Sequence, residues 1–335
     1  MKSAPCWLAV LTLAYGSRAT ATETAQVIPT SYEAGHFYAV PETRDGQRLK
    51  LLVDTGGGGG SGMYWITAAA AQRLHLKTST CMLGTDSATV AALPDYKSEH
   101  GLPPPLPGPC GKTLWVNPGD DVDGQLGAGY LPGRVWTFDY PARQLSVEEP
   151  TWRADASAHA TPLGFQRNNR GALASGMARI VIRVDDQPLD MLLDTGATAH
   201  PTMAGEKASG TPTVNGIGVT SYIVTSQLER WHRAHPDWPI VLQGDDLFGP
   251  KSAMRMIQVP QVQIAGWSVG PVWFTERADI NFDLHEGMSS YMDKQVTGAV
   301  GGNVFQHFVM TLDYPQRTAY FRCVSGCRAI SPPAP

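Results

Sequence analysis

The sequence lacks long apolar runs, and it is poor in charge of either sign. Of its 335 residues 17% are charged, with a formal net charge of −4 and no run of Lys or Arg. The longest apolar runs fall short of the roughly 18 residues that span a bilayer as a helix, which excludes a multi-span membrane protein. The charge pattern argues against nucleic acid as a partner. With 42% hydrophobic residues, the chain is long enough to bury the core of one large or two modest domains.

Cysteine is also scarce, with five in all, and Cys6 lies in an N-terminal leader. The other four, Cys81, Cys110, Cys323 and Cys327, fit no common zinc-ligand spacing, so we expect neither a metal site nor a cofactor. An even number of cysteines in an exported chain predicts two disulfides. Three pairings are possible, and we favour the two local ones, 81 with 110 and 323 with 327.

The leader has the features of a signal peptide. Lys2 precedes the short apolar run 4–14, and Ala19-Thr20-Ala21 offers a cleavage site between small residues. We therefore expect residues 1–21 to be removed and the mature protein to be exported, periplasmic or secreted, with no membrane attachment.

What the chain has in excess is glycine and proline, 35 and 26 residues respectively. This surplus is typical of many short strands joined by turns, and it predicts an all-β fold with few short helices.

Two segments of the chain repeat a strand-turn-strand pattern. Residues 36–54 and 177–194 each contain a β-rich run, a polar turn and a returning apolar strand. Both returning strands lead into the same tripeptide, Asp54-Thr55-Gly56 and Asp194-Thr195-Gly196.

A second pair of segments, 123–147 and 297–321, shares a hydrophobic-Gly motif followed by a strand ending in Asp-Tyr-Pro. Two similar halves in the same order predict a pseudo-twofold, two-lobed molecule, with an N-terminal lobe over 22–150 and a C-terminal lobe over 151–330. The second half is longer by about 34 residues. We place that extra length within 221–292, where 221–236 suggests a helix that ends at a proline.

The paired tripeptides carry a specific chemistry. An Asp at a strand end projects into a cleft, Thr can bond to a partner loop, and Gly lets the backbone turn close to the carboxylate. Two such loops face to face would bring Asp54 and Asp194 close enough to share one proton. One carboxylate would then act as general base on a water while the other donates a proton to a substrate carbonyl.

These motifs resemble the aspartic peptidases of the retropepsin and pepsin group, and most of all bacterial retropepsin-like proteins, here in tandem. The resemblance rests on LLVDTG and MLLDTG, followed by QLG at 125–127 and AVG at 299–301. It implies that Asp54 and Asp194 form a catalytic dyad, that Thr55 and Thr195 join the two loops, and that Gly56 and Gly196 lie beneath them. It also implies a peptide or protein substrate and a monomer that holds one complete site.

Two residues depart from the family pattern. The family has Ser, Thr or Ala where this chain has Gly57, and an apolar residue where it has Gln125. No aromatic-bearing hairpin is evident as a cover for the site; Tyr96 and Tyr222 are the candidates. The alternative to an exported aspartic endopeptidase is therefore a catalytically silent peptide- or protein-binding module on the same fold.

Other patterns have simpler explanations. Residues 57–62 match a dinucleotide-binding glycine pattern, but no acidic residue follows at the required spacing. The segment 119–124 resembles a calcium loop with Gly119 in the first ligand place. We expect turns at both, a turn role for Asp139 and Asp313, and a helix-surface position for the histidines near 232–235.

Overall fold

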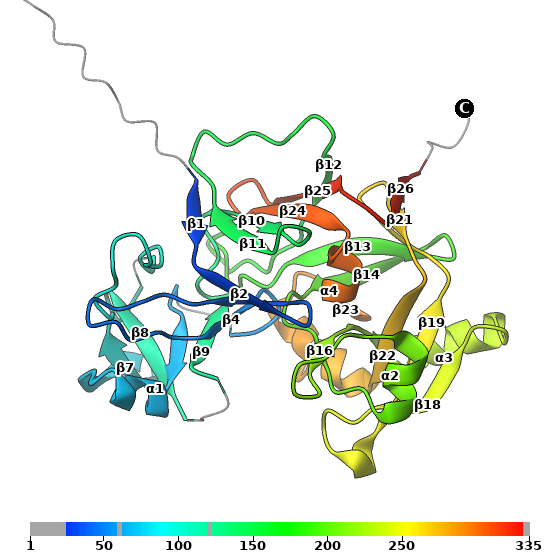
Figure 1. Cartoon of the computed structure of the whole chain (residues 1–335), viewed down its shortest axis with the longest axis horizontal. Coiled ribbons are helices and arrows are strands. Elements are labelled where there is room, and N and C mark those ends of the chain that lie inside the picture. Colours follow the sequence, from blue (N-terminus) through cyan, green and yellow to red (C-terminus); the bar gives the residue numbers. More distant parts are fainter. Residues whose placement is uncertain (1–24, 59–61, 107, 119–121, 331–335) are drawn as a thin grey trace, which may run out of the picture.

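The computed structural model describes residues 25–58, 62–106, 108–118 and 122–330. The predicted signal peptide, and parts of the segments 57–62 and 119–124, lie outside these ranges. No helix within them is long and apolar enough to cross a membrane. The predicted class, a mostly β, two-lobed fold with few short helices, is confirmed (Figure 1).

One lobe is built on an eight-stranded sheet, at the left of Figure 1. In spatial order its strands are β2 (Thr30–Glu33), β3 (His36–Ala39), β4 (Leu51–Asp54), β9 (Gly124–Gly127), β5 (Trp65–Thr67), β8 (Thr113–Asn117), β7 (Asp86–Ala92) and β6 (Thr78–Leu83). Helix α1 (Ala68–Arg73) follows β5, and the hydroxyl of Thr67 caps it by accepting from the Ala70 N–H.

The other lobe is built on a ten-stranded sheet. Its strands are, in spatial order, β18 (Ile240–Asp245), β19 (Met254–Val259), β22 (Val272–Arg277), β17 (Ser221–Val224), β23 (Gly298–Val300), β14 (Gln187–Leu193), β13 (Arg179–Val184), β20 (Val262–Ile264), β21 (Trp267–Val269) and β26 (Cys327–Ala329). The remaining elements of this half are the small pair β15 (Thr198–Ala199) and β16 (Gly218–Val219), the helices α2 (Met203–Ser209), α3 (Thr225–Ala234) and α4 (Gly302–Phe305), and the 3-10 turns η1 (Pro250–Ser252), η2 (Asp279–Phe282) and η3 (Met288–Tyr291).

The strands around each aspartate are paired in the same way in both lobes. β4 runs parallel to β9, and β14 runs parallel to β23; β5 and β17 then pair antiparallel to β9 and β23. Strands β8 and β22 follow in parallel on the outer side of each. The shared order means that the two aspartates leave equivalent places in equivalent sheets.

A six-stranded sheet joins the two lobes, with β1 (Gln26–Ile28), β11 (Gln144–Val147), β10 (Val135–Asp139), β24 (Phe308–Asp313), β25 (Thr318–Cys323) and β12 (His159–Pro162). Strands β10 and β24 pair antiparallel so that Thr137 lies opposite Thr311, its equivalent in the other repeat. Their Oγ1 atoms are 2.8 Å apart. Equivalent residues meet each other only at a twofold axis, so the pseudo-twofold axis passes between these threonines.

The hairpins around the aspartates differ in detail from the sequence prediction. β13 and β14 form a tight hairpin, because Asp185 and Asp186 both adopt the positive φ of a two-residue turn, 50° and 57°. Ile180, Ile182 and Val184 alternate into the core along β13. The first repeat is not a tight hairpin. Strands β3 and β4 pair at only two positions, and the long loop between them forms isolated β-bridges of its own.

The extra residues of the second half do not all lie within 221–292, so that prediction is wrong in part. Trp65 and Tyr222 occupy equivalent positions, opposite residues 125 and 299. Trp65 follows Asp54 by 11 residues, whereas Tyr222 follows Asp194 by 28. Half of the extra residues therefore precede 221, in the segment holding α2 and the β15–β16 pair. The helix expected over 221–236 forms as α3 only from Thr225, because 221–224 is drawn into the sheet as β17.

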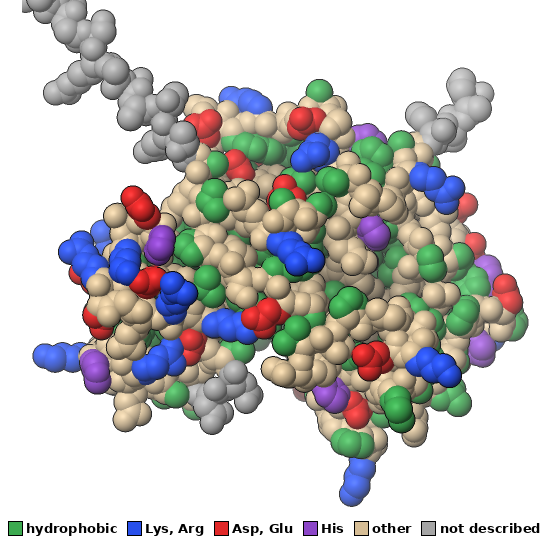
Figure 2. Space-filling model, viewed as in Figure 1, with side chains coloured by type: hydrophobic (Ala, Val, Ile, Leu, Met, Phe, Trp, Pro, Cys, Tyr) green, Lys and Arg blue, Asp and Glu red, His purple; other side chains and the backbone are tan. Residues whose placement is uncertain are grey.

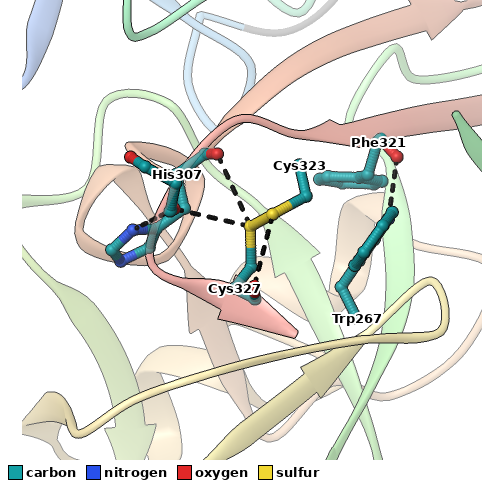
Figure 3. Close-up of a disulfide and its surroundings, with 6 residues drawn as sticks. Trp267, His307, Phe321, Cys323 and Cys327 are labelled. Atoms are coloured by element: carbon teal, nitrogen blue, oxygen red, sulfur yellow. Dashed lines mark hydrogen bonds between the residues drawn. A yellow bond between two sulfur atoms is a disulfide. The ribbon is translucent and has the colours of Figure 1, made fainter. Parts of the chain in front are cut away.

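Both favoured disulfides are present, with Cα atoms 5.9 Å apart for Cys81–Cys110 and 6.1 Å apart for Cys323–Cys327. The first ties β6 to the loop before β8. The second closes the corner between β25 and β26, beside the backbone oxygen of His307 and the Trp267 indole that donates to Phe321 (Figure 3). Asp139 and Asp313 accept from backbone amides three residues onward, which confirms their turn role. The predicted lobe boundary at 150 and 151 stays a prediction.

Candidate active site

The two Asp-Thr-Gly loops, one from each lobe, meet face to face. Figure 2 shows that the molecule is notched at the lower edge of that view. Asp54 is the last residue of β4, and Asp194 directly follows β14. Each strand lies beside the parallel strand that ends in the hydrophobic-Gly motif, and the Asp194 N–H donates to Val300 O at 2.9 Å. The structure thus brings all six predicted site residues together.

Reciprocal threonine bonds hold the loops in register. The Thr55 N–H donates to Thr195 Oγ1 at 3.1 Å, and the Thr195 N–H donates to Thr55 Oγ1 at 3.0 Å. Each hydroxyl in turn donates across the interface, Thr55 to Leu193 O at 2.7 Å and Thr195 to Val53 O at 2.8 Å. Both threonines are fully buried, so these four bonds are made away from water.

The glycines let each carboxyl reach the opposite loop. A Cβ on Gly56 would lie 2.3 Å from Asp194 Cγ, and one on Gly196 would lie 2.3 Å from Asp54 Cγ. No side chain fits at that distance, so the two glycines are required for the approach of the carboxyls. Each glycine N–H also donates to Oδ1 of the aspartate in its own loop, at 2.8 Å to Asp54 and 2.9 Å to Asp194.

The two carboxyls are hydrogen-bonded to each other and titrate as a pair. Burial raises the pKa of Asp54, while bonds from backbone amides and from Asp194 oppose that effect. The pKa of Asp194 is raised well above its usual value, first by burial and then by the charge of Asp54. The pair therefore holds one proton between its two carboxyls, because burial opposes the charging of both groups at once.

Gln125, a departure from the family pattern, belongs to the site. Its Nε2 donates to Asp54 Oδ2 at 2.7 Å, and the residue is 8% exposed. The equivalent position in the other lobe is Ala299, which offers no such bond. The sequence already shows this asymmetry, since QLG at 125–127 corresponds to AVG at 299–301. Only the structure shows that the amide of Gln125 contacts Asp54.

Each of the two candidate cover residues has its hydroxyl bonded within its own lobe. Tyr96 is packed inside the first lobe, where its hydroxyl bonds to that of Tyr64 at 2.8 Å. Tyr222 is on β17, and its hydroxyl donates to Thr198 O at 2.6 Å, which supports the loop after Asp194 from beneath. Both hydroxyls are therefore tied to neighbouring protein atoms, and a covering role for either tyrosine stays a prediction.

A pocket of about 460 Å³ adjoins Tyr222. Its wall includes Arg277, stacked on the rings of Tyr222 and Phe248 at 4.2 and 5.1 Å, and its rim includes the exposed side chains of Ile280 and Tyr291. Phe248 is 63% exposed in the connection between β18 and β19. Sequence analysis missed this cluster because its members come from four separate segments.

Of the histidines near 232–235, His232 lies on α3, with a buried Nδ1 that has no partner among the described residues, and His235 directly follows the helix. His235 stacks on Trp238 and its Nε2 lies 2.8 Å from Asp185 Oδ2. Another histidine, His36, was overlooked. It is buried at 1% exposure, and its Nε2 lies 3.2 Å from Thr198 Oγ1 in the loop after Asp194.

Comparison with known proteins finds similar solved structures with low sequence identity to this chain. No family model matches the chain, and no curated protein matches it. Among solved structures, the aspartic proteinase of Irpex lacteus aligns over 90% of this chain and 98% of its own, with 12% identity and a TM-score of 0.48. Two seed proteins, conglutin gamma, a basic 7S globulin of lupine, and the basic 7S globulin of soybean, each align over 90% of this chain and 95% of their own. Their identities are 13% and 10%, and both TM-scores are 0.45. Similarity this low establishes neither a family nor an activity, and the finer resemblance to tandem bacterial retropepsin-like proteins stays a prediction.

Proposed function

We propose that this chain is an exported aspartic endopeptidase that hydrolyses peptide bonds through the Asp54–Asp194 dyad. The observation that carries the proposal is the meeting of two carboxyls, on the buried Asp194 and the half-buried Asp54, between two loops that reciprocal threonine bonds hold together; burial raises the pKa of both. A binding protein gains nothing from this arrangement, because burying two carboxyls side by side costs stability.

The chemistry follows from the two protonation states. The Asp54 carboxylate takes a proton from a water as the water oxygen attacks the peptide carbonyl carbon. The Asp194 carboxyl gives its proton to the carbonyl oxygen, which yields a neutral tetrahedral diol. As the diol collapses and the C–N bond breaks, the proton acquired by Asp54 passes to the departing amine, and one diol hydroxyl returns a proton to Asp194 as it becomes the new carbonyl. The attacking group is water, so no covalent enzyme intermediate forms.

The substrate would be a peptide or protein segment lying between the lobes, with a side chain seated in the pocket beside Tyr222. That pocket has an apolar rim and adjoins the residue that supports the Asp194 loop. The two disulfides favour an oxidising, exported location, in line with the predicted signal peptide.

The first prediction tests the dyad. Asp54→Asn and Asp194→Asn should each lower kcat/KM on a mixed peptide library by at least about a hundredfold, because each variant lacks one proton-transfer group. Wild-type activity should fall at high pH, as Asp194 loses its proton, and at low pH, as Asp54 gains one. Cleavage is measured by mass spectrometry across about pH 3 to 9 with chain from residue 22 onward.

Asp139→Asn is the matched control, since Asp139 also ends a strand but accepts only from the turn amide of Ala142, a bond that Asn keeps. It should cleave like the wild type. Stoichiometric capture of an uncleaved peptide by the wild type would instead establish the silent binding module. Equal cleavage by wild type and both dyad variants would refute the dyad.

A further inference from the structure

Gly57 and Gln125 lie around one oxygen of Asp54. A Cβ on Gly57 would be 2.4 Å from Asp54 Oδ2 and 2.7 Å from Gln125 Nε2, closer than real side chains approach. The Gln125 amide thus occupies the space that a side chain at position 57 would need. In the other lobe the corresponding positions hold Ala197 and Ala299, and no described residue other than Asp54 bonds to Asp194 through its side chain. The two departures from the family pattern are therefore spatially one feature.

We propose that Gln125 is a positioning residue that fixes Asp54 as the charged partner of the dyad, and that Gly57 is glycine because it must admit the Gln125 amide. The proposal rests on the function proposed above. It explains why an otherwise symmetric site, with equivalent strands, threonines and glycines, has one aspartate that differs from the other.

The chemical reason lies in what an amide nitrogen can do. Nε2 donates hydrogen bonds and accepts none, so its contact with Asp54 Oδ2 favours a carboxylate and disfavours a protonated oxygen there. The opposite amide orientation would place Oε1 there, which would accept from a protonated Oδ2; the structure instead presents the donor Nε2. Because the shared proton is excluded from this side, it is left to Asp194.

The position of Gln125 makes the contact rigid. It lies on β9 between two paired strands, opposite Leu52 of β4 and Trp65 of β5. The titratable groups around Asp54 are Asp194, from the opposite loop, and the phenol of Tyr314. Burial raises the pKa of Tyr314, so this phenol stays neutral and Asp194 alone competes for the proton.

The test uses Gln125→Met, which has a similar length and shape and no N–H. The acidic limb of the kcat/KM profile, which reports ionisation of Asp54, should move to higher pH by about one to two units, as loss of a bond to a charged group predicts. A limb that stays within about 0.3 units of wild type, in a variant that melts normally, would overturn the proposal.

A second readout does not depend on activity. If Asp54 is charged with the help of Gln125, Gln125→Met should lose stability relative to wild type as pH rises through the titration of the pair, and match it more closely at low pH. The denaturant midpoint at several pH values measures this. If the wild type cuts no peptide, the endopeptidase fails while this titration still decides the role of Gln125; a stability difference that is constant with pH would refute it.

A mutant cycle tests the coupling to Gly57. Gly57→Ala should impair cleavage strongly, because the new Cβ displaces both the carboxylate and the amide. In the Gln125→Ala background the carboxylate can shift into the space the amide leaves, so the same substitution should do less harm, by at least about threefold. Additive effects of the two substitutions would contradict the shared-space account.

Discussion

At the scale of single residues, the site consists of polar groups that contact one another at close range and are shielded from water. His36 shows that such buried polar contacts continue beyond the dyad. It lies on β3 of the first lobe, yet its ring reaches Thr198 in the second, and burial lowers its pKa to about 4. Its Nδ1 has no partner among the described residues. A histidine in this environment is neutral in the folded state and readily charged in the unfolded one.

His36 should therefore contribute a pH-dependent loss of stability. Its folded pKa of about 4 lies below its unfolded value of 6.5, so the unfolded state binds more protons. Stability is full above about pH 6.5 and falls as pH drops toward 4, by about 3 kcal/mol at most. His36→Gln, which keeps a polar contact and does not titrate, should remove this slope in urea denaturation between pH 4 and 7. The same slope in both proteins would exclude His36 as its source.

At the scale of elements, the four threonine bonds connect the ends of two sheets that otherwise share no strand at this point. Thr55 and Thr195 each satisfy a backbone N–H and a backbone C=O of the opposite lobe. A threonine at each strand end therefore replaces the ladder bonds that the strands lose where they leave their sheets.

Removing one hydroxyl should thus leave two buried backbone groups without partners. Thr55→Val, which keeps the shape, should cost about 2 to 4 kcal/mol in unfolding free energy. It should lower cleavage as well, because the loops lose their register. Thr55→Ser retains the hydroxyl and should recover most of both. Chemical denaturation and kcat/KM measure the pair of effects, and a serine variant as damaged as the valine variant would show that packing, not hydrogen bonding, is what matters.

At the scale of the whole molecule, the twofold arrangement is completed inside one chain. The six-stranded sheet takes strands from both halves, and equivalent threonines, Thr137 and Thr311, meet at its centre. The aspartate loops meet in the same symmetric manner. Each half supplies one carboxyl, so neither half contains a complete site.

Activity should accordingly be a property of the monomer. If the chain has the proposed activity, its specific activity should stay constant as the protein is diluted from micromolar to low nanomolar concentration, since no association step is needed to complete the site. Sedimentation at the same concentrations should give the mass of a single chain. Specific activity that falls on dilution, together with a dimeric mass at high concentration, would mean that a second chain takes part.

Much of the architecture was predictable because it is encoded in local pattern. Two copies of Asp-Thr-Gly after apolar strands and matched Asp-Tyr-Pro turns are patterns of neighbouring residues, and they predict the fold class. The spacing of the four cysteines favoured the pairing that the structure shows but left two other pairings open. The helix after residue 221 was predicted too long, because pairing with β22 and β23 draws its first residues into a strand.

What the sequence alone determined is the duplicated frame and the identity of the residues brought to its centre. The tertiary structure decided that the surroundings of the two aspartates differ, since Gln125 donates to Asp54 across neighbouring strands. It also decided that His36 contacts the loop after Asp194 and that Tyr222 links this loop to the pocket beside Arg277. Contacts of this kind join residues far apart in the chain, and their energies depend on burial and distance, which no local pattern of residues contains.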